Sequence, residues 1–332
     1  MTEETTLINK YSGKAKLRVN LLLLAFVAVL FFLNAYNSVI TKRPTIVHQL
    51  RQADCLSITK NYYEEGMNFF NPKIHFQGNL HGNAVSEFPI LNYTVAFLWK
   101  IFGEHEFIYK FLEYFLFLLS MFILFNTLLK FTASNVFSFF ITSLFLTSPL
   151  LAYYSFNYLA DVPALSLAIM GFCFLASFYH SRSIKYFYWC LFVSTLAVLI
   201  KASAVLPFAT LFFFSIIDLA NLNKIFRSEK LFAKKIFPAV ALAISLTIVI
   251  SWYRFAINYN NSANSVFLLT VLPIWEMPES TILTHLQTLF NVMFPIFFSK
   301  PIFFLFFVAV VFVYSNFKKL NIFLRYSMVF AT

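Results

Sequence analysis

Ionisable side chains are concentrated in residues 41–87, between two apolar stretches of the chain. This segment carries Asp54, His75, His81 and Glu87. A carboxylate or an imidazole can take a proton from a reacting hydroxyl group when it lies within hydrogen-bond reach of that group. Because the sequence on both sides of the segment is apolar, we expect proton-transfer chemistry to take place here.

Three of these residues could also be combined into a metal site. His75, His81 and Glu87 have suitable ligand atoms, but their spacing matches no pair of ligands on one face of a helix. Residues 77–83, Gln-Gly-Asn-Leu-His-Gly-Asn, are typical of a turn. We therefore predict no metal site in this segment and interpret both histidines as solvated or substrate-contacting side chains.

Two further charged residues stand at the ends of apolar stretches. Asp161 precedes one stretch and is followed by Pro163, a pattern typical of the first turn of a helix, where a carboxylate is stabilised. Lys201 ends another stretch, so its ammonium group either extends to the membrane surface or binds an anion. For both residues a structural role and a ligand-binding role stay open at this point.

Purely structural roles are also available to other charged residues. Asp54 could cap a helix that is predicted to begin near Ser57, because Asp is a favoured N-cap residue. Lys110 and Glu113 lie about one turn apart in an apolar stretch, which predicts a partly buried ion pair.

The composition indicates that membrane helices position these side chains. Of the 332 residues, 60% are hydrophobic and 12% are charged, with a mean hydropathy of +0.74, which excludes a soluble domain. The net charge of +11 comes from Lys and Arg in short segments between apolar stretches, so we expect contacts with membrane lipids and no nucleic-acid partner. The six glycines form no phosphate-binding loop, and the three cysteines imply no disulfide framework.

The alternation of apolar and basic segments predicts a topology. Lys and Arg before residues 17–40 make that stretch a first span with the N-terminus in the cytoplasm. Most acids and few basic residues fall in the segments predicted to lie outside. The predicted order continues with an extracytoplasmic loop at 41–106 that contains an interfacial helix near 90–102, core spans in 107–256, a second extracytoplasmic segment at 257–300, and further spans in 301–332.

The core is expected to begin with a helical hairpin, Phe107–Lys130 followed by Val136–Tyr154. No repeat of fixed period and no flexible linker interrupts the chain. The sequence therefore predicts an all-α, polytopic integral membrane helical bundle that forms a single domain over residues 1–332.

Several short motifs, taken in order, resemble a known family. They are Gln52-Ala53-Asp54, Ser86-Glu87-Phe88-Pro89-Ile90-Leu91-Asn92-Tyr93, Ser148-Pro149, residues 158–163, and Ala197-Val198-Leu199-Ile200-Lys201. Over residues 17 to about 256 the chain resembles the GT-C glycosyltransferases that use a polyprenyl-phosphate sugar, such as the lipid A aminoarabinose transferase and the protein O-mannosyltransferases. This resemblance implies a GT-C fold whose first extracytoplasmic loop contains interfacial helices.

The resemblance also implies roles for individual residues. Asp54 would be the catalytic base that accepts the proton of the acceptor hydroxyl group. Asp161 would face the same cavity and orient the acceptor or the sugar. Lys201 would lie near the lipid phosphate, where negative charge develops as the glycosidic bond breaks.

The chain departs from the family at the residues that recognise phosphate. Glu87 is kept, but Phe88 follows it where relatives often carry a lysine. Cys55 and Ser57 stand where many relatives have a second acid and an arginine. We expect Glu87, His81 and Arg254 to contact substrate, and the candidates to replace the missing lysine are Arg51, Lys60, Arg254 and His285.

The expected function is transfer of a sugar, with inversion, from a polyprenyl-phosphate carrier to a lipid, glycan or protein acceptor on the outer side of a bacterial inner membrane. The donor lipid is a substrate, no cofactor is implied, and participation of a divalent metal stays open. Relatives usually continue with further spans and sometimes an outer domain, so the chain is expected to be either a fragment or a naturally short relative. A transporter or lipid flippase, or a non-catalytic subunit of an envelope assembly complex, are the alternatives.

Overall fold

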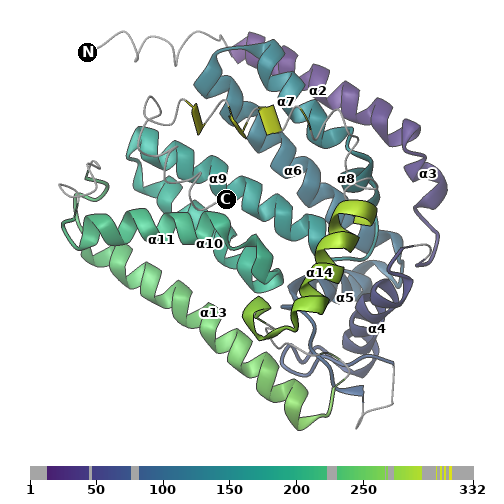
Figure 1. The fold of residues 1–332 in the computed structure, drawn as a ribbon. Helices are drawn as coiled ribbons and strands as arrows, with labels where there is room; N and C mark the ends of the chain where they lie inside the picture. Colours follow the sequence, from purple (N-terminus) through teal and green to yellow (C-terminus); the bar gives the residue numbers. More distant parts are fainter. Residues whose placement is uncertain are drawn as a thin grey trace. The chain divides into compact units, whose positions relative to one another are not determined.

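The computed structural model is helical. It describes residues 13–44, 47–75, 82–222, 230–265, 267 and 273–293, together with 304, 307, 308, 310, 311, 314 and 315. Within these residues there is no β-strand, and extended pairing is limited to an isolated bridge between Lys73 and Asn83. The predicted all-α class is confirmed for this part of the chain (Figure 1).

The chain divides into two compact units. Contacts group Met1–Leu268 as one unit and Leu269–Thr332 as the other. The expectation of a single domain over residues 1–332 stays a prediction.

Three of the described helices are long and apolar enough to cross a membrane: α6 (Phe107–Thr132), α9 (Asp161–Ser181) and α13 (Ile236–Ser262). A membrane protein is therefore supported by length and composition. Shorter apolar helices are predicted to complete the bundle, among them α7 (Asn135–Leu146), α10 (Ile184–Ile200) and α11 (Leu206–Leu219).

The first predicted span is interrupted. Instead of one helix over 17–40, the chain forms α2 (Gly13–Leu33) and the short α3 (Tyr36–Val39). The break lies at Ala35, whose backbone is left-handed with φ of 53°. After the break Tyr36 is buried and its hydroxyl group donates a hydrogen bond to the Ala152 carbonyl at 2.6 Å, so a tertiary contact fixes the new direction of the chain.

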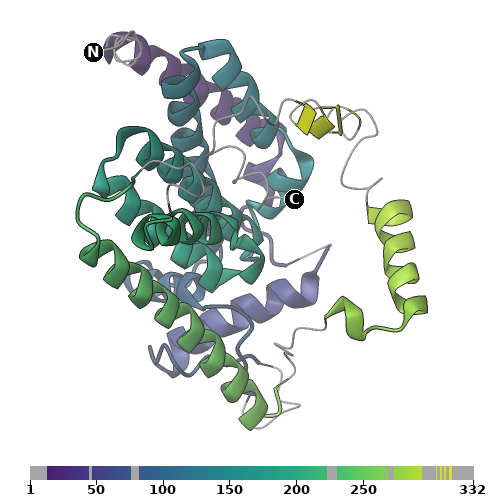
Figure 2. The same ribbon diagram turned by 60° about the vertical axis from the view of Figure 1, so that its left-hand side comes forward.

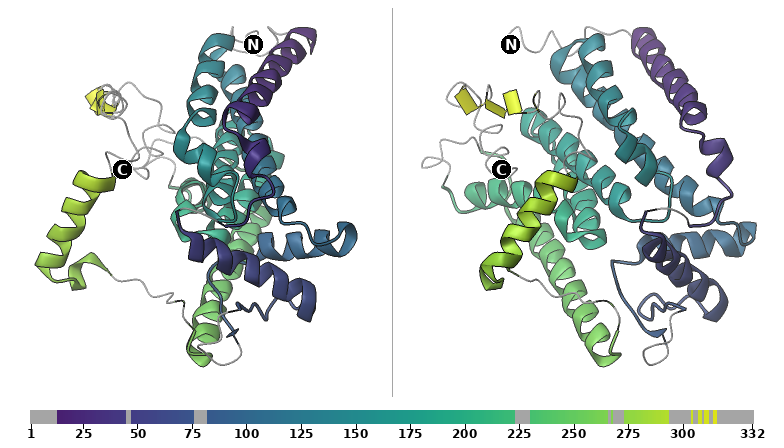
Figure 3. Two further views of the ribbon diagram at one scale, coloured as in Figure 1. Left: turned by 90° about the vertical axis from the view of Figure 1, so that its right-hand side faces the viewer. Right: turned by 45° about the vertical axis from the view of Figure 1, so that its right-hand side comes forward.

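The predicted outer segment contains two helices, α4 (Gln49–Glu65) and α5 (Ile90–Phe102). The α5 helix lies between Pro89 and Gly103 and has the bounds expected from the sequence. The two helices pack on each other at one end of α6 (Figures 1 and 3). Their position at a membrane surface stays a prediction.

The second half of the predicted hairpin is also broken. The stretch Val136–Tyr154 forms α7 (Asn135–Leu146) and α8 (Pro149–Tyr154) rather than one helix. Pro149 has no N–H group to donate into a continuing helix, and the Ser148 hydroxyl oxygen accepts a hydrogen bond from the Leu151 N–H group, which starts α8.

The centre of the first unit is formed by α9 packed against α6 and α10 (Ile184–Ile200). A short 3₁₀ turn, η2 (Ala202–Ala204), leads from α10 into α11 (Leu206–Leu219). At Gly171 an added Cβ would lie 2.6 Å from Ser194 Oγ and 3.1 Å from Pro207 Cβ. Glycine at this position therefore allows the close approach of α9 and α10.

The α13 helix packs on α10, and its C-terminal end reaches the segment before α5 (Figure 2). Asn260 bonds both backbone groups of Val85, donating to the carbonyl and accepting from the N–H group, each at 2.8 Å. The helix continues to Ser262, beyond the expected end at Ala256, because Asn260 is buried in this contact.

The second unit contains η3 (Ile274–Glu276), α14 (Glu279–Thr288) and a π-helical turn, Leu289–Met293. These residues belong to the segment 257–300, which is predicted to be extracytoplasmic. Most of the spans predicted in 301–332 lie outside the described residues.

Candidate functional site

The first element of the site is an ion pair between α4 and the segment before α5. Arg51 donates to the carboxylate of Glu87, and Ser86 Oγ donates to the other carboxylate oxygen of Glu87 at 2.5 Å. Arg51 also lies over the ring of Phe267, 4.9 Å from its centroid. Glu87 is thus held between a cation and a hydroxyl group, with its side chain 22% exposed.

Asp54 lies on the same face of α4, one turn after Arg51. The helix begins at Gln49, so the alternative in which Asp54 caps a helix near Ser57 is wrong. Within the described residues the Asp54 carboxylate has no hydrogen-bond or ion-pair partner. Burial raises the pKa of Asp54 above its ordinary value; Arg51 acts against this rise and Glu87 adds to it.

The second element of the site is an ion pair between α9 and the end of α10. Asp161, the first residue of α9, accepts a hydrogen bond from Lys201, the residue that follows α10. Asp161 lies in the first turn of α9, as the sequence predicted, where the helix N-terminus favours a carboxylate; the N-cap residue is Ala160, and no side chain makes a cap hydrogen bond at this end. The side chains of Lys201 and Asp161 are 36% and 45% exposed.

This ion pair lies at the edge of an apolar cavity of about 380 Å³. The cavity is formed by α7, α9, η2 and the start of α11, and apart from Asp161, Lys201 and Ser203 every lining residue is apolar. Such a lining suits a hydrocarbon chain whose charged end lies beside the ammonium group.

The two elements are connected through the backbone. The Phe88 N–H group donates to the Leu199 carbonyl at 3.3 Å, which joins the residue after Glu87 to the last turn before Lys201. Tyr253 on α13 donates to the neighbouring Val198 carbonyl at 2.7 Å. The structure therefore brings both ion pairs to the same end of the bundle.

A buried polar network fixes α4 in place. Asn92 on α5 donates to the Cys55 carbonyl at 2.7 Å and lies 3.2 Å from Thr59 Oγ1 and 3.3 Å from the Tyr109 hydroxyl group. Burial raises the pKa of the Cys55 thiol well above its ordinary value, so Cys55 is a packed thiol and not a nucleophile.

Glu113 is a buried acid whose interaction was predicted wrongly from the sequence. The predicted ion pair with Lys110 does not form: Lys110 Nζ instead donates to the carbonyls of Val39 and Lys42, each at 2.6 Å. Glu113 is fully buried, and among the described residues its carboxylate has no side-chain hydrogen-bond partner and interacts with the backbone of Asn157. It interacts electrostatically with Asp161 and so lies close to the second ion pair.

The other residues predicted to contact substrate or phosphate do not join the two ion pairs among the described residues. Arg254 is exposed on α13, and its neighbour Tyr253 interacts electrostatically with Glu87. Lys60 pairs with Glu64 and Glu104. His285 belongs to the other unit, and His81 lies outside the described residues.

The residues around the site do not assemble a metal centre in the part of the chain that is described. No three His, Cys, Asp or Glu side chains there lie close enough to share an ion. The described His75 is exposed.

Sequence reasoning singled out Asp54, Glu87, Asp161 and Lys201 as candidates, but it did not predict the ion pairs Arg51–Glu87 and Lys201–Asp161. Arg51 was one of several possible cations, and nothing in its sequence position distinguished it. Glu113 could have been found from a simple signal, an acid inside an apolar stretch.

Comparisons of the chain with protein-family models, with curated proteins and with solved structures give no significant match.

Proposed function

We propose that this protein is a membrane glycosyltransferase that transfers a sugar from a polyprenyl phosphate to an acceptor hydroxyl group. The observation that carries the proposal is the arrangement of a half-buried carboxylate, Asp54, at the same end of the bundle as an ion pair bordering an apolar cavity. Sugar transfer from a lipid phosphate needs these two features together: a base for the acceptor and a cation for the leaving group.

The donor lipid would occupy the apolar cavity between α9 and α11. Lys201 would bind its phosphate, because an ammonium group has three protons and the contact with Asp161 uses one of them. Asp161 would then hold Lys201 in place or accept a hydrogen bond from a sugar hydroxyl group.

Asp54 would act as the general base. The proton of the acceptor hydroxyl group passes to the Asp54 carboxylate while the oxygen forms a bond to the anomeric carbon of the sugar. The bond between that carbon and the phosphate oxygen breaks on the opposite face, and its electron pair stays with the polyprenyl phosphate. Attack from the opposite face inverts the anomeric configuration, and the negative charge that develops is stabilised by Lys201.

The acceptor is proposed to be a lipid, glycan or protein on the outer side of a bacterial inner membrane. The support for this side is the distribution of charge along the sequence, with basic residues in the segments assigned to the cytoplasm. No step of the mechanism requires a metal ion.

The test is transfer of radiolabelled sugar from a panel of polyprenyl-phosphate sugars to crude membrane acceptors. The solubilised wild type should form labelled product, and Asp54→Asn should reduce the rate by about 10²-fold or more, the contribution typical of a general base. Glu64→Gln, an exposed acid on the same helix, is the matched control and should keep the wild-type rate. Equal labelling by wild type and Asp54→Asn would remove Asp54 as the base.

A transporter is the second candidate, and the buried Glu113 favours it. An acid inside an apolar helix often carries a proton or an ion in transporters. Uptake or release of a substrate by reconstituted protein that depends on Glu113 but not on Asp54 would establish this alternative. Sugar transfer that depends on Asp54 and survives in Glu113→Gln would exclude it.

A further inference from the structure

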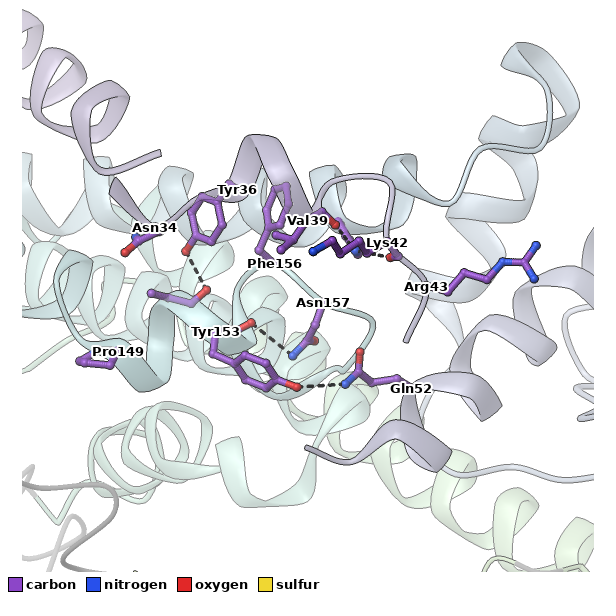
Figure 4. A pocket seen from close by; sticks show the side chains of 12 residues that line it. Asn34, Tyr36, Val39, Lys42, Arg43, Gln52, Pro149, Tyr153, Phe156 and Asn157 are labelled. Atoms are coloured by element: carbon purple, nitrogen blue, oxygen red, sulfur yellow. Dashed lines mark hydrogen bonds between the residues drawn. The ribbon is translucent and has the colours of Figure 1, made fainter. Parts of the chain in front are cut away.

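A second cavity lies between the first predicted span and the helices around it (Figure 4). Its volume is about 320 Å³. It is formed by the ends of α2 and α3, the start of α4, the first turns of α6, and α8 with the residues that follow it. It shares no lining residue with the cavity beside Asp161 and Lys201.

The lining of this second cavity is amphipathic. Val39, Pro149, Ala152 and Phe156 provide apolar surface. The polar side chains are Asn34, Tyr36, Gln52, Tyr153 and Asn157, and the charged ones are Lys42, Arg43 and Lys110. All the charged residues in the lining are therefore cations.

Two of these cations, Lys42 and Lys110, make no salt bridge with the described residues. Within the described residues no carboxylate lies in salt-bridge range of Lys42 or Lys110, and their ammonium groups are close enough to repel each other. Glu106, the N-cap residue of α6, pairs with Arg43 at 3.3 Å and also attracts Lys110 electrostatically. Arg43 is 85% exposed and extends away from the other lining side chains in Figure 4.

Lys110 is a buried ammonium group at the wall of the cavity. Its residue is 4% exposed, and its Nζ lies 5.0 Å from the centroid of the Tyr158 ring. Two of its three protons go to the carbonyls of Val39 and Lys42. Burying a positive charge beside a second one is costly; Glu106 offsets part of this cost, and a phosphate in the cavity would offset more of it.

We infer that this cavity binds the phosphate headgroup of an anionic membrane lipid. Lys42 and Lys110 would contact the phosphate, and the wall of Val39, Ala152 and Phe156 would contact the first carbons of the lipid. A lipid fits the site better than a soluble anion because the cavity directly follows an apolar helix that is predicted to be a membrane span. The inference does not depend on the sugar-transfer reaction.

The test is a lipid titration followed by native mass spectrometry. Delipidated full-length protein in detergent is titrated with phosphatidylglycerol or with phosphatidylcholine, and bound lipids are counted. Wild type should bind one phosphatidylglycerol molecule more tightly than phosphatidylcholine. Lys42→Gln should weaken the binding of phosphatidylglycerol about fivefold, the effect of one basic residue near an anionic lipid.

The matched control is Lys100→Gln on α5. Lys100, like Lys42, is an exposed lysine, but it lies outside the cavity and donates to the Tyr63 carbonyl, so phosphatidylglycerol should bind this variant as it binds wild type. Lys110→Met is a second test variant that keeps the length of the apolar stem. If Lys110→Met fails to fold, Lys42→Gln still decides the question. Equal affinity of wild type and Lys42→Gln for phosphatidylglycerol would overturn the inference.

A competition experiment separates a lipid from a soluble phosphate. Inorganic phosphate and glycerol 3-phosphate are added to the complex of wild type with phosphatidylglycerol. Both should displace the lipid only at concentrations far above that of the lipid, because they lack contacts with the apolar wall. Displacement by inorganic phosphate at concentrations equal to that of the lipid would show a site for soluble anions and overturn the assignment to a lipid.

Discussion

Asp54 and Asp161 are the same residue type at the same end of the bundle, yet their surroundings give them different chemistry. Asp161 is neutralised by Lys201. Asp54 is half-buried, without a direct partner among the described residues, and next to the acid Glu87, so its pKa is raised. A raised pKa makes a carboxylate a stronger base, which is the property that the proposed role of Asp54 needs.

The raised pKa of Asp54 predicts the acid limb of the activity. A base works only when it is ionised, so transfer should fall, as the pH is lowered, at a higher pH than for an unperturbed aspartate. Glu87→Gln removes a neighbouring negative charge, which lowers the pKa of Asp54 and shifts this limb to lower pH. The pH dependence of kcat/KM measures both effects.

The control for this shift is Glu64→Gln, which should leave the acid limb in place because Glu64 is paired with Lys60 and does not contribute to the pKa of Asp54. An acid limb that moves to higher pH in Glu87→Gln would contradict the assignment of Asp54 as the titrating base.

Lys201 should affect the donor and not the fold. In Lys201→Gln the KM for the polyprenyl-phosphate sugar should rise roughly 10- to 100-fold, the effect of losing a hydrogen bond to a charged group. Thermal stability should change little, since both partners of the ion pair are partly exposed. Steady-state kinetics and thermal unfolding measure the two quantities, and Lys60→Gln is the control. An unchanged KM would show that Lys201 does not bind the donor phosphate.

At the level of helices, the sequence predicted bounds best where strong local signals exist. Pro89 and Gly103 lie on either side of α5, and both bounds of this helix were predicted correctly. The break at Ala35 has no such signal, because it is fixed by the burial of Tyr36 against α8. Periodicity and hydropathy do not contain a contact of this kind.

The site shows the same limit. Asp161 and Lys201 are 40 residues apart in sequence, and only the packing of α9 on α10 brings them together. Glu113 was predicted to form an ion pair with Lys110 because the two residues are one turn apart. Lys110 instead donates hydrogen bonds to two backbone carbonyls that follow the first span. Local spacing therefore found which residues are unusual but not which groups they contact.

The close approach of α9 and α10 can be tested at Gly171. Gly171→Ala should destabilise the protein by about 2 kcal/mol, because the new methyl group overlaps Ser194 Oγ. Adding Ser194→Ala should recover part of this loss, since Pro207 Cβ still lies 3.1 Å from the new atom. Thermal unfolding of the two single variants and the double variant measures the interaction. Strictly additive effects would contradict the overlap.

For the whole molecule the main prediction is the orientation in the membrane. The described cysteines are buried, so a cysteine introduced at the surface should dominate labelling by thiol reagents. Lys100→Cys, in the predicted outer segment, should react with a membrane-impermeant maleimide in intact cells. Lys185→Cys, in a predicted inner loop, should react only after the membrane is permeabilised.

Wild type is the control for background labelling. Labelling of Lys185→Cys but not of Lys100→Cys in intact cells would reverse the topology and place Asp54 in the cytoplasm. The proposed donor would then have to be presented from the other leaflet.

The hydrogen bond from the Phe88 N–H group to the Leu199 carbonyl is made by main-chain atoms alone. Any residue except proline can occupy position 88 without removing the donor. Side chains at this position that keep the packing against Phe69 and Trp252 can therefore diverge during evolution while Glu87 and Lys201 keep their separation. A lineage could change the residues that recognise a new substrate here without losing the inherited geometry of the two charges.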